Sequence, residues 1–160
     1  MSADVGRTAV YAAELAAFDG TDLEAVVGVD AVRRLVTDVV EGEWWPGPAV
    51  VVRAMRSDAR SSNARCDGDS TTISIAAPQA TVATAIHELA HALAGVAAGH
   101  DETFRRAHLD VVAVATNLRR SDTRGDLHVD QLRSAYAAAG LAIGPRSWPE
   151  PPSVGGAIAL

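Results

Sequence analysis

Two histidines and a glutamate stand close together near the middle of the chain, at His87, Glu88 and His91. On an α-helix, side chains four positions apart lie on nearly the same face, so both imidazoles can reach one metal ion. Neutral imidazoles suit Zn²⁺, and the glutamate between them is placed to act as a general base toward water. The spacing therefore predicts a zinc site that supports hydrolysis.

The surrounding segment has the pattern of a helix. It is rich in alanine from Gln79 to Ala97 and has no proline after Pro78. Apolar residues at helical spacing form a stripe, which consists of Ile86, Leu89, Leu93 and Val96. The two histidines lie on the flank of this stripe and Glu88 lies further round, away from the core. The alternative is a helix whose histidines only hydrogen-bond within the fold, but that would leave the glutamate unexplained.

A catalytic zinc usually has three protein ligands and one open position for water. Gly95 and Gly99 are predicted to end the helix, and His100 follows at once. Asp101 then opens a second helical pattern. A short turn that folds this second helix back beside the first brings His100 near the other two histidines.

The pattern His87-Glu88-x-x-His91, a loop and then Gly99-His100-x-x-x-Phe104 resembles the SprT-like and related small zincin metallopeptidases. The resemblance covers about residues 49–119. It implies that the three histidines bind zinc, that Glu88 is the catalytic base and that Phe104 is a packing residue. The whole chain also resembles an uncharacterised family of small bacterial metallohydrolases, which opens with a segment like Tyr11-Ala12-Ala13-Glu14.

The third ligand has two alternatives to His100. A gluzincin takes a glutamate from a later helix, for which Glu102 is the nearest candidate, and an aspartate-ligand zincin would use Asp110. Imidazole is the commoner zinc ligand, and His100 is the residue at the family-like position, which favours it. The zinc-ribbon cysteines that SprT-like proteins often carry are missing, because Cys66 is the only cysteine.

Composition limits the class of protein. The 160 residues, 48% of them hydrophobic, suit one globular domain over residues 1–144, followed by a proline- and glycine-rich tail over 145–160 that is flexible or draped on the surface. The net charge is −6 and no basic cluster stands out, so nucleic-acid binding is not expected. No signal pattern or membrane-spanning apolar run is present, so we expect a soluble, cytoplasmic protein that does not bind a membrane.

The order of elements predicts the α+β class, with a zincin-like fold. We expect a small mixed or antiparallel sheet of about three strands, an active-site helix and flanking helices. The alternating segment Ser70–Pro78 is expected to be a strand leading into that helix, and in zincins such a strand commonly forms the sheet edge along which a peptide lies. The other expected elements are helices over Thr8–Phe18, within Asp22–Val40 and over Asp130–Ala139, a strand over Val50–Met55, and a turn-like Arg60–Arg65 that closes a hairpin into Cys66.

Three further residues are weighed for roles near the zinc. Tyr136 could donate a hydrogen bond to the oxyanion of the transition state, although a lone helical tyrosine is more often packed. His108 and His128 are expected to be surface or supporting residues. The predicted function is therefore a zinc metallopeptidase acting on a peptide or protein substrate. The alternative is a non-catalytic zincin-fold module that binds metal or a protein partner.

Overall fold

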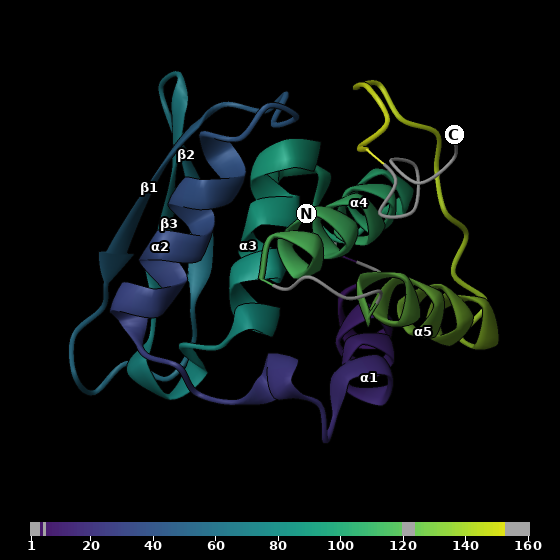
Figure 1. Ribbon diagram of the computed structural model, residues 1–160, viewed down its shortest axis with the longest axis horizontal. Coiled ribbons are helices and arrows are strands. Elements are labelled where there is room, and N and C mark those ends of the chain that lie inside the picture. Colours follow the sequence, from purple (N-terminus) through teal and green to yellow (C-terminus); the bar gives the residue numbers. More distant parts are fainter. Residues whose placement is uncertain (1–3, 5, 120–123, 153–160) are drawn as a thin grey trace.

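The structure, a computed structural model, describes residue 4 and residues 6–119 and 124–152. Helices and a small sheet alternate along these residues, which confirms the expected α+β class (Figure 1). The elements are α1 Arg7–Phe18, α2 Val29–Val40, β1 Ala49–Ala54, β2 Asn63–Asp67, β3 Ser70–Ile75, α3 Val82–Ala94, α4 Glu102–Arg119 and α5 Arg124–Ala138.

The three-stranded sheet is mixed, as expected, but the expected hairpin through Arg60–Arg65 is wrong, because β2 begins at Asn63 and does not pair with β1. Strand β3 lies in the centre, parallel to β1 and antiparallel to β2. The tight hairpin joins β2 to β3, where Gly68 takes a φ of +65° between the paired residues Asp67 and Ser70. The expectation that the strand before the active-site helix forms the sheet edge is wrong, because β3 is paired on both sides; β2 is the edge strand beside α3.

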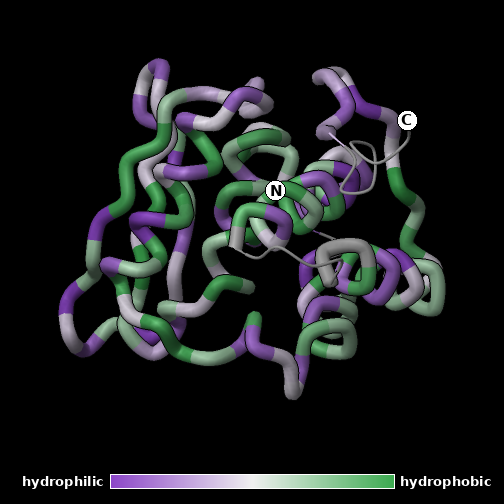
Figure 2. Tube along the Cα trace, in the orientation of Figure 1, coloured by the Kyte–Doolittle hydropathy of each residue, from purple (hydrophilic) through white to green (hydrophobic). Residues whose placement is uncertain are grey.

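Helices α2 and α3 cover one face of the sheet (Figure 1). Ile73 and Ile75 of β3 point into this interface and are fully buried. On the opposite face, Val51 and Arg53 are exposed, because side chains alternate along a strand. Helix α3 is mostly hydrophobic, interrupted by a few hydrophilic positions (Figure 2), and it lies between the sheet and the helices α1, α4 and α5.

The last helix begins at Arg124 rather than at Asp130, so His128 lies within the helix and not before it. His128, Leu132 and Tyr136 follow one another at four-residue spacing and are all buried. The buried face of α5 therefore continues through a histidine, which a search for apolar residues does not recognise.

The described part of the tail is draped over the surface and is held there. Asp110, buried on α4, accepts two hydrogen bonds from the guanidinium of Arg146, at 2.7 and 3.0 Å, and one from the indole of Trp148 at 2.8 Å. Trp44 donates its indole hydrogen to the carbonyl oxygen of Pro149 at 2.9 Å. Among the described residues, no helix has the length and apolar character that crossing a bilayer requires.

We expect Asp110→Ala to lower the free energy of unfolding by about 2 kcal/mol, because it leaves a guanidinium and an indole without their shared acceptor. Chemical denaturation measures this change. Glu150→Gln is the matched control, because the Glu150 carboxylate is largely exposed and lies 3.4 Å from the same guanidinium. A free energy of unfolding that is equal in the two variants would contradict this account of the tail.

Candidate metal centre

Three buried histidines converge between α3 and the start of α4. His87 and His91 lie one turn apart on α3, and His100 precedes α4. Each offers a ring nitrogen, and the three nitrogens lie within 4.8 Å of one another. The structure thus brings together the three residues that the sequence predicted as ligands.

Two glycines allow the chain to turn after α3 and to bring His100 back beside the other two histidines. Gly95 ends α3 with a φ of +95°, and Gly99 takes a φ of +61° directly before His100. A Cβ on Gly99 would also stand 3.1 Å from the carboxylate of Asp4, so the position is crowded as well as left-handed. Asp101 then caps α4 by accepting hydrogen bonds from the amides of Thr103 and Phe104.

Two carboxylates from the N-terminal part of the chain orient the histidines. Glu14 of α1 lies 2.8 Å from Nδ1 of His87, and Asp4 lies 2.5 Å from Nδ1 of His100. Asp4 also accepts the backbone amide of His100 at 3.1 Å. A carboxylate is acceptor-only when ionised, so each Nδ1 carries the hydrogen and donates it.

These hydrogen bonds leave the Nε2 atoms free to bind a cation. In the neutral tautomers that the carboxylates select, Nε2 of His87 and Nε2 of His100 each carry a lone pair, and they lie only 3.1 Å apart. Two ligand nitrogens on a tetrahedral zinc ion, each at about 2.0–2.1 Å, are separated by roughly 3.3 Å. Nδ1 of His91 is also buried without a hydrogen bond to any described residue. The donor set therefore fits a zinc ion.

The environment keeps two of the three ligands neutral. Burial lowers the pKa of His91 to about 3, and the neighbouring imidazoles add to this effect. Burial also lowers the pKa of His100, although the hydrogen bond to Asp4 opposes it. For His87, burial would lower the pKa, but the charge and hydrogen bond of Glu14 outweigh it and raise the value. Neutral imidazole is the form that binds metal.

Glu14 is held from behind by a buried chain of polar groups. The same oxygen that faces His87 lies 3.1 Å from Nε2 of His108, and Nδ1 of His108 lies 2.5 Å from the hydroxyl of Tyr136. Burial would raise the pKa of Glu14, but His87 and His108 lower it to about 2, so the carboxylate stays ionised. His108 is thus a supporting residue, as expected, but it is fully buried and not on the surface.

The geometry does not support the predicted role of Tyr136 as an oxyanion donor. The side chain is fully buried on α5, and its hydroxyl is taken up by His108. Two surface hollows adjoin Glu88, and Tyr136 lines neither of them. The geometry favours the alternative, in which Tyr136 is a packed residue.

The other candidate ligands lie outside the histidine cluster. Asp110 is engaged by Arg146 and Trp148, and Glu102 is exposed at the start of α4. In the described part of the chain, neither residue belongs to a group of side chains that could hold a metal ion.

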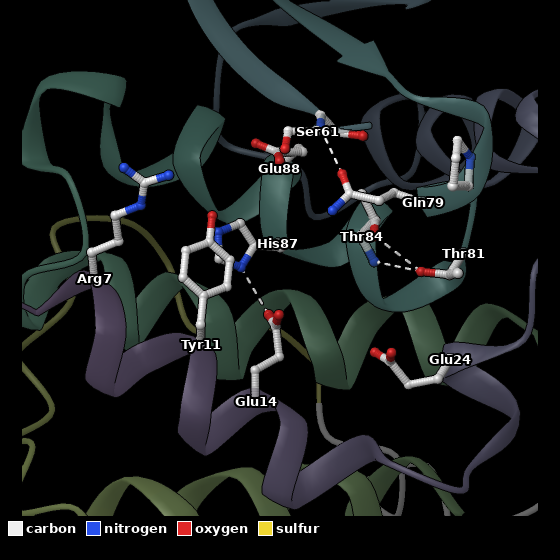
Figure 3. A pocket seen from close by; sticks show the side chains of 12 residues that line it. Arg7, Tyr11, Glu14, Glu24, Ser61, Gln79, Thr81, Thr84, His87 and Glu88 are labelled. Carbon is white, nitrogen blue, oxygen red and sulfur yellow. Dashed lines mark hydrogen bonds and ion pairs between the residues drawn. The ribbon is translucent and has the colours of Figure 1, made fainter. Parts of the chain in front are cut away.

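Glu88 lies between two hollows in the surface. The inner hollow, of about 340 Å³, includes Glu24, Thr84 and His87 in its lining (Figure 3). The histidine hollow, of about 170 Å³, includes His91 and His100. Both hollows share Glu88, so a molecule in either of them reaches its carboxylate. Burial raises the pKa of Glu88 to about 7, and the charge of Glu14 adds to this while His87 opposes it.

Helix α1 supplies a wall of the site that the sequence reasoning missed. Arg7, Tyr11 and Glu14 share one face of α1 and point toward α3 (Figure 3). The ring of Tyr11 stacks on His87, with centroids 5.0 Å apart and planes at 10°. The hydroxyl of Tyr11 points away from Glu14 and toward Glu88. The available signal was the helical spacing of these three polar residues within an otherwise alanine-rich segment.

Comparisons of the chain with protein-family models, curated proteins and solved structures found no match in any of the three.

We expect the purified protein to bind one zinc ion per chain, and His100→Ala to weaken that binding by more than about 100-fold, because it removes one of three imidazole ligands. Competition with a chromophoric zinc chelator measures the affinity. Glu102→Gln is the control and should bind zinc like the wild type. Loss of zinc in the Glu102 variant with retention in the His100 variant would reverse the assignment of the third ligand.

Glu14→Gln is expected to weaken zinc binding by about 10- to 100-fold, because a neutral amide holds the Nδ1 hydrogen of His87 less strongly than a carboxylate does. The same competition titration applies. Glu24→Gln is the matched control, since Glu24 lines the same hollow without a contact to a histidine ligand. Equal affinities in the two variants would remove Glu14 from the metal centre.

Proposed function

We propose that the protein is a zinc-dependent hydrolase of the zincin-like class, and specifically a metallopeptidase. The observation that carries the proposal is the pair of Nε2 atoms that face each other 3.1 Å apart, beside a buried glutamate that lines two hollows. His87, His91 and His100 would hold the zinc. When bound, zinc supplies Lewis-acid chemistry, which polarises a carbonyl group and acidifies water.

Glu88 performs the proton transfers in this proposal. Its carboxylate accepts a proton from the attacking water and returns it to the amine that leaves. Burial raises the pKa of Glu88 to about 7, and a zinc ion nearby would lower it toward the ionised form that a general base requires. The phenol of Tyr11 lines both hollows and is a better placed hydrogen-bond donor for the developing oxyanion than Tyr136.

The substrate class is a peptide or protein, and the proposed location is the cytoplasm. The edge strand β2 supports this substrate, because its first residues Asn63 and Ala64 line the histidine hollow and its outer edge is unpaired in the sheet. An extended peptide can pair with such an edge through backbone hydrogen bonds. Nucleic acid and membrane remain outside the proposal, as the composition suggested.

The alternative function is a module that binds zinc or a protein partner without turnover. A structural zinc site normally has four protein ligands, whereas three histidines converge here among the described residues. Burying Glu88 also costs stability, because its carboxylate makes no hydrogen bond to another described residue. A structural site gains nothing from that cost, while a hydrolase needs the group.

We expect Glu88→Gln to lower the hydrolysis rate by at least about 100- to 10,000-fold while one zinc ion per chain stays bound, because the amide accepts no proton from water. Cleavage of a peptide library, followed by mass spectrometry, is compared with the zinc content of the same sample. Glu41→Gln, exposed at the end of α2 and outside both hollows, is the control and should keep both. A fully active Glu88→Gln protein would end the mechanism, and a zinc-loaded wild type that cleaves no peptide would favour the module.

A further inference from the structure

The two hollows beside Glu88 continue into a third hollow on the open face of the sheet. The inner hollow and the histidine hollow share Arg7, Tyr11 and Glu88. The sheet hollow, of about 570 Å³, shares Asn63 with the histidine hollow and lies over strands β1, β3 and β2. Asn63 of the edge strand is thus the residue that links the sheet hollow to the other two, and we call this linked set of three hollows the trench.

The sheet end of the trench is basic on balance, because Arg53, Arg56 and Arg65 line it against one lining carboxylate, that of Asp67. Arg53 of β1 is in register with Ser74 of β3, and Arg65 of β2 is in register with Thr72. Both arginines are exposed on the face opposite the core, and both line the sheet hollow with these two hydroxyl side chains. Guanidinium groups with hydroxyl donors between them suit carboxylates.

These arginines are not neutralised by the protein itself. Within the described residues, no carboxylate forms an ion pair with Arg53, Arg65 or Arg7. Arg7 instead lies over the ring of Tyr11, with its guanidinium carbon 5.8 Å from the centroid. The acids nearest the zinc ligands, Asp4 and Glu14, are engaged by histidines. The positive charge along this part of the trench is therefore available to a ligand, although the chain as a whole carries −6.

The opposite end of the trench has the opposite charge. Glu24 lines the inner hollow on the side away from Arg7 (Figure 3). A substrate that spans Glu88 would thus meet a carboxylate on one side and arginines on the other. This difference in charge between the two ends of the trench indicates which end of the ligand is acidic and in which orientation the ligand lies.

We propose that the substrate is an extended polypeptide with acidic side chains on one side of the scissile bond, which bind Arg7, Arg53 and Arg65. This inference rests on the proposed function and names the substrate class of the same site. Acidic residues on the other side of the scissile bond meet Glu24 and are disfavoured.

The test uses fluorogenic peptides with one common core. One carries glutamates on the amino side of the scissile bond, one carries them on the carboxyl side, and one carries alanines. We expect the wild type to prefer one glutamate peptide over the alanine peptide by about ten-fold in kcat/KM, with no such gain for the other. The preference should shrink at high salt, since these arginines are exposed.

The double variant Arg53→Gln, Arg65→Gln should lose this preference through a higher KM for the glutamate peptide, so that the glutamate and alanine peptides are cleaved with nearly equal kcat/KM. Arg33→Gln is the matched control, because Arg33 lies on α2 and pairs with Asp30. A preference that survives in the double variant, or equal cleavage of all three peptides by the wild type, would overturn the inference and leave the proposed function intact.

Binding to the zinc-loaded Glu88→Gln protein, measured by fluorescence anisotropy, tests the inference without turnover. The same glutamate peptide should bind about ten-fold more tightly than the alanine peptide, and the two arginine substitutions should abolish the difference. Selective binding without cleavage by the wild type would reject the hydrolase and retain the charge-selective trench. Equal binding of all three peptides would reject the trench as an acidic-substrate site.

Discussion

The structure depends on two hydrogen bonds that orient the histidines: Nδ1 of His87 donates to the carboxylate of Glu14, and Nδ1 of His100 donates to that of Asp4. These hydrogen bonds fix the tautomer of each ring and turn both Nε2 atoms toward one point. They also tie the N-terminal part of the chain to α3, since Asp4 and Glu14 come from there. Helix α1 is therefore part of the site wall and not an accessory to the domain, which explains why Tyr11 stacks on a ligand ring.

The buried row behind His87 shows how the fold supports the hydrogen bond to Glu14. Glu14 faces His87 and His108, and His108 accepts the hydroxyl hydrogen of Tyr136. An ionised carboxylate in such a place is costly unless each lone pair meets a donor. The apolar surroundings strengthen the electrostatic contacts that exist. Tyr136 thus contributes to the site at a distance, through packing and a hydrogen bond, rather than by contact with substrate.

The local part of this arrangement could be predicted from the sequence, and the long-range part could not. The positions of His87 and His91 follow from helix periodicity, and the returns at Gly95 and Gly99 follow from backbone sterics. The partnership of Glu14 with His87 joins residues 73 positions apart, and no local pattern encodes it. The parallel pairing of β1 with β3 and the capture of Asp110 by Arg146 are equally non-local. Each of these contacts depends on how the helices and strands pack together, because packing decides which of their faces meet.

The charge of the site suits the dication that we propose. A proton shared between the two Nε2 atoms would also relieve the repulsion of their lone pairs, and the raised pKa of His87 is in that direction. However, Asp4 and Glu14 both have lowered pKa values: burial opposes this in each case, and contacts with histidines outweigh it. The site therefore holds two negative charges before Glu88 is counted. One proton neutralises half of that charge, whereas a zinc ion neutralises it fully and also gives the buried, unpaired carboxylate of Glu88 a cation nearby. A single divalent ion would bind the facing Nε2 atoms, balance the charge of the ionised carboxylates and provide a cation near the buried carboxylate of Glu88.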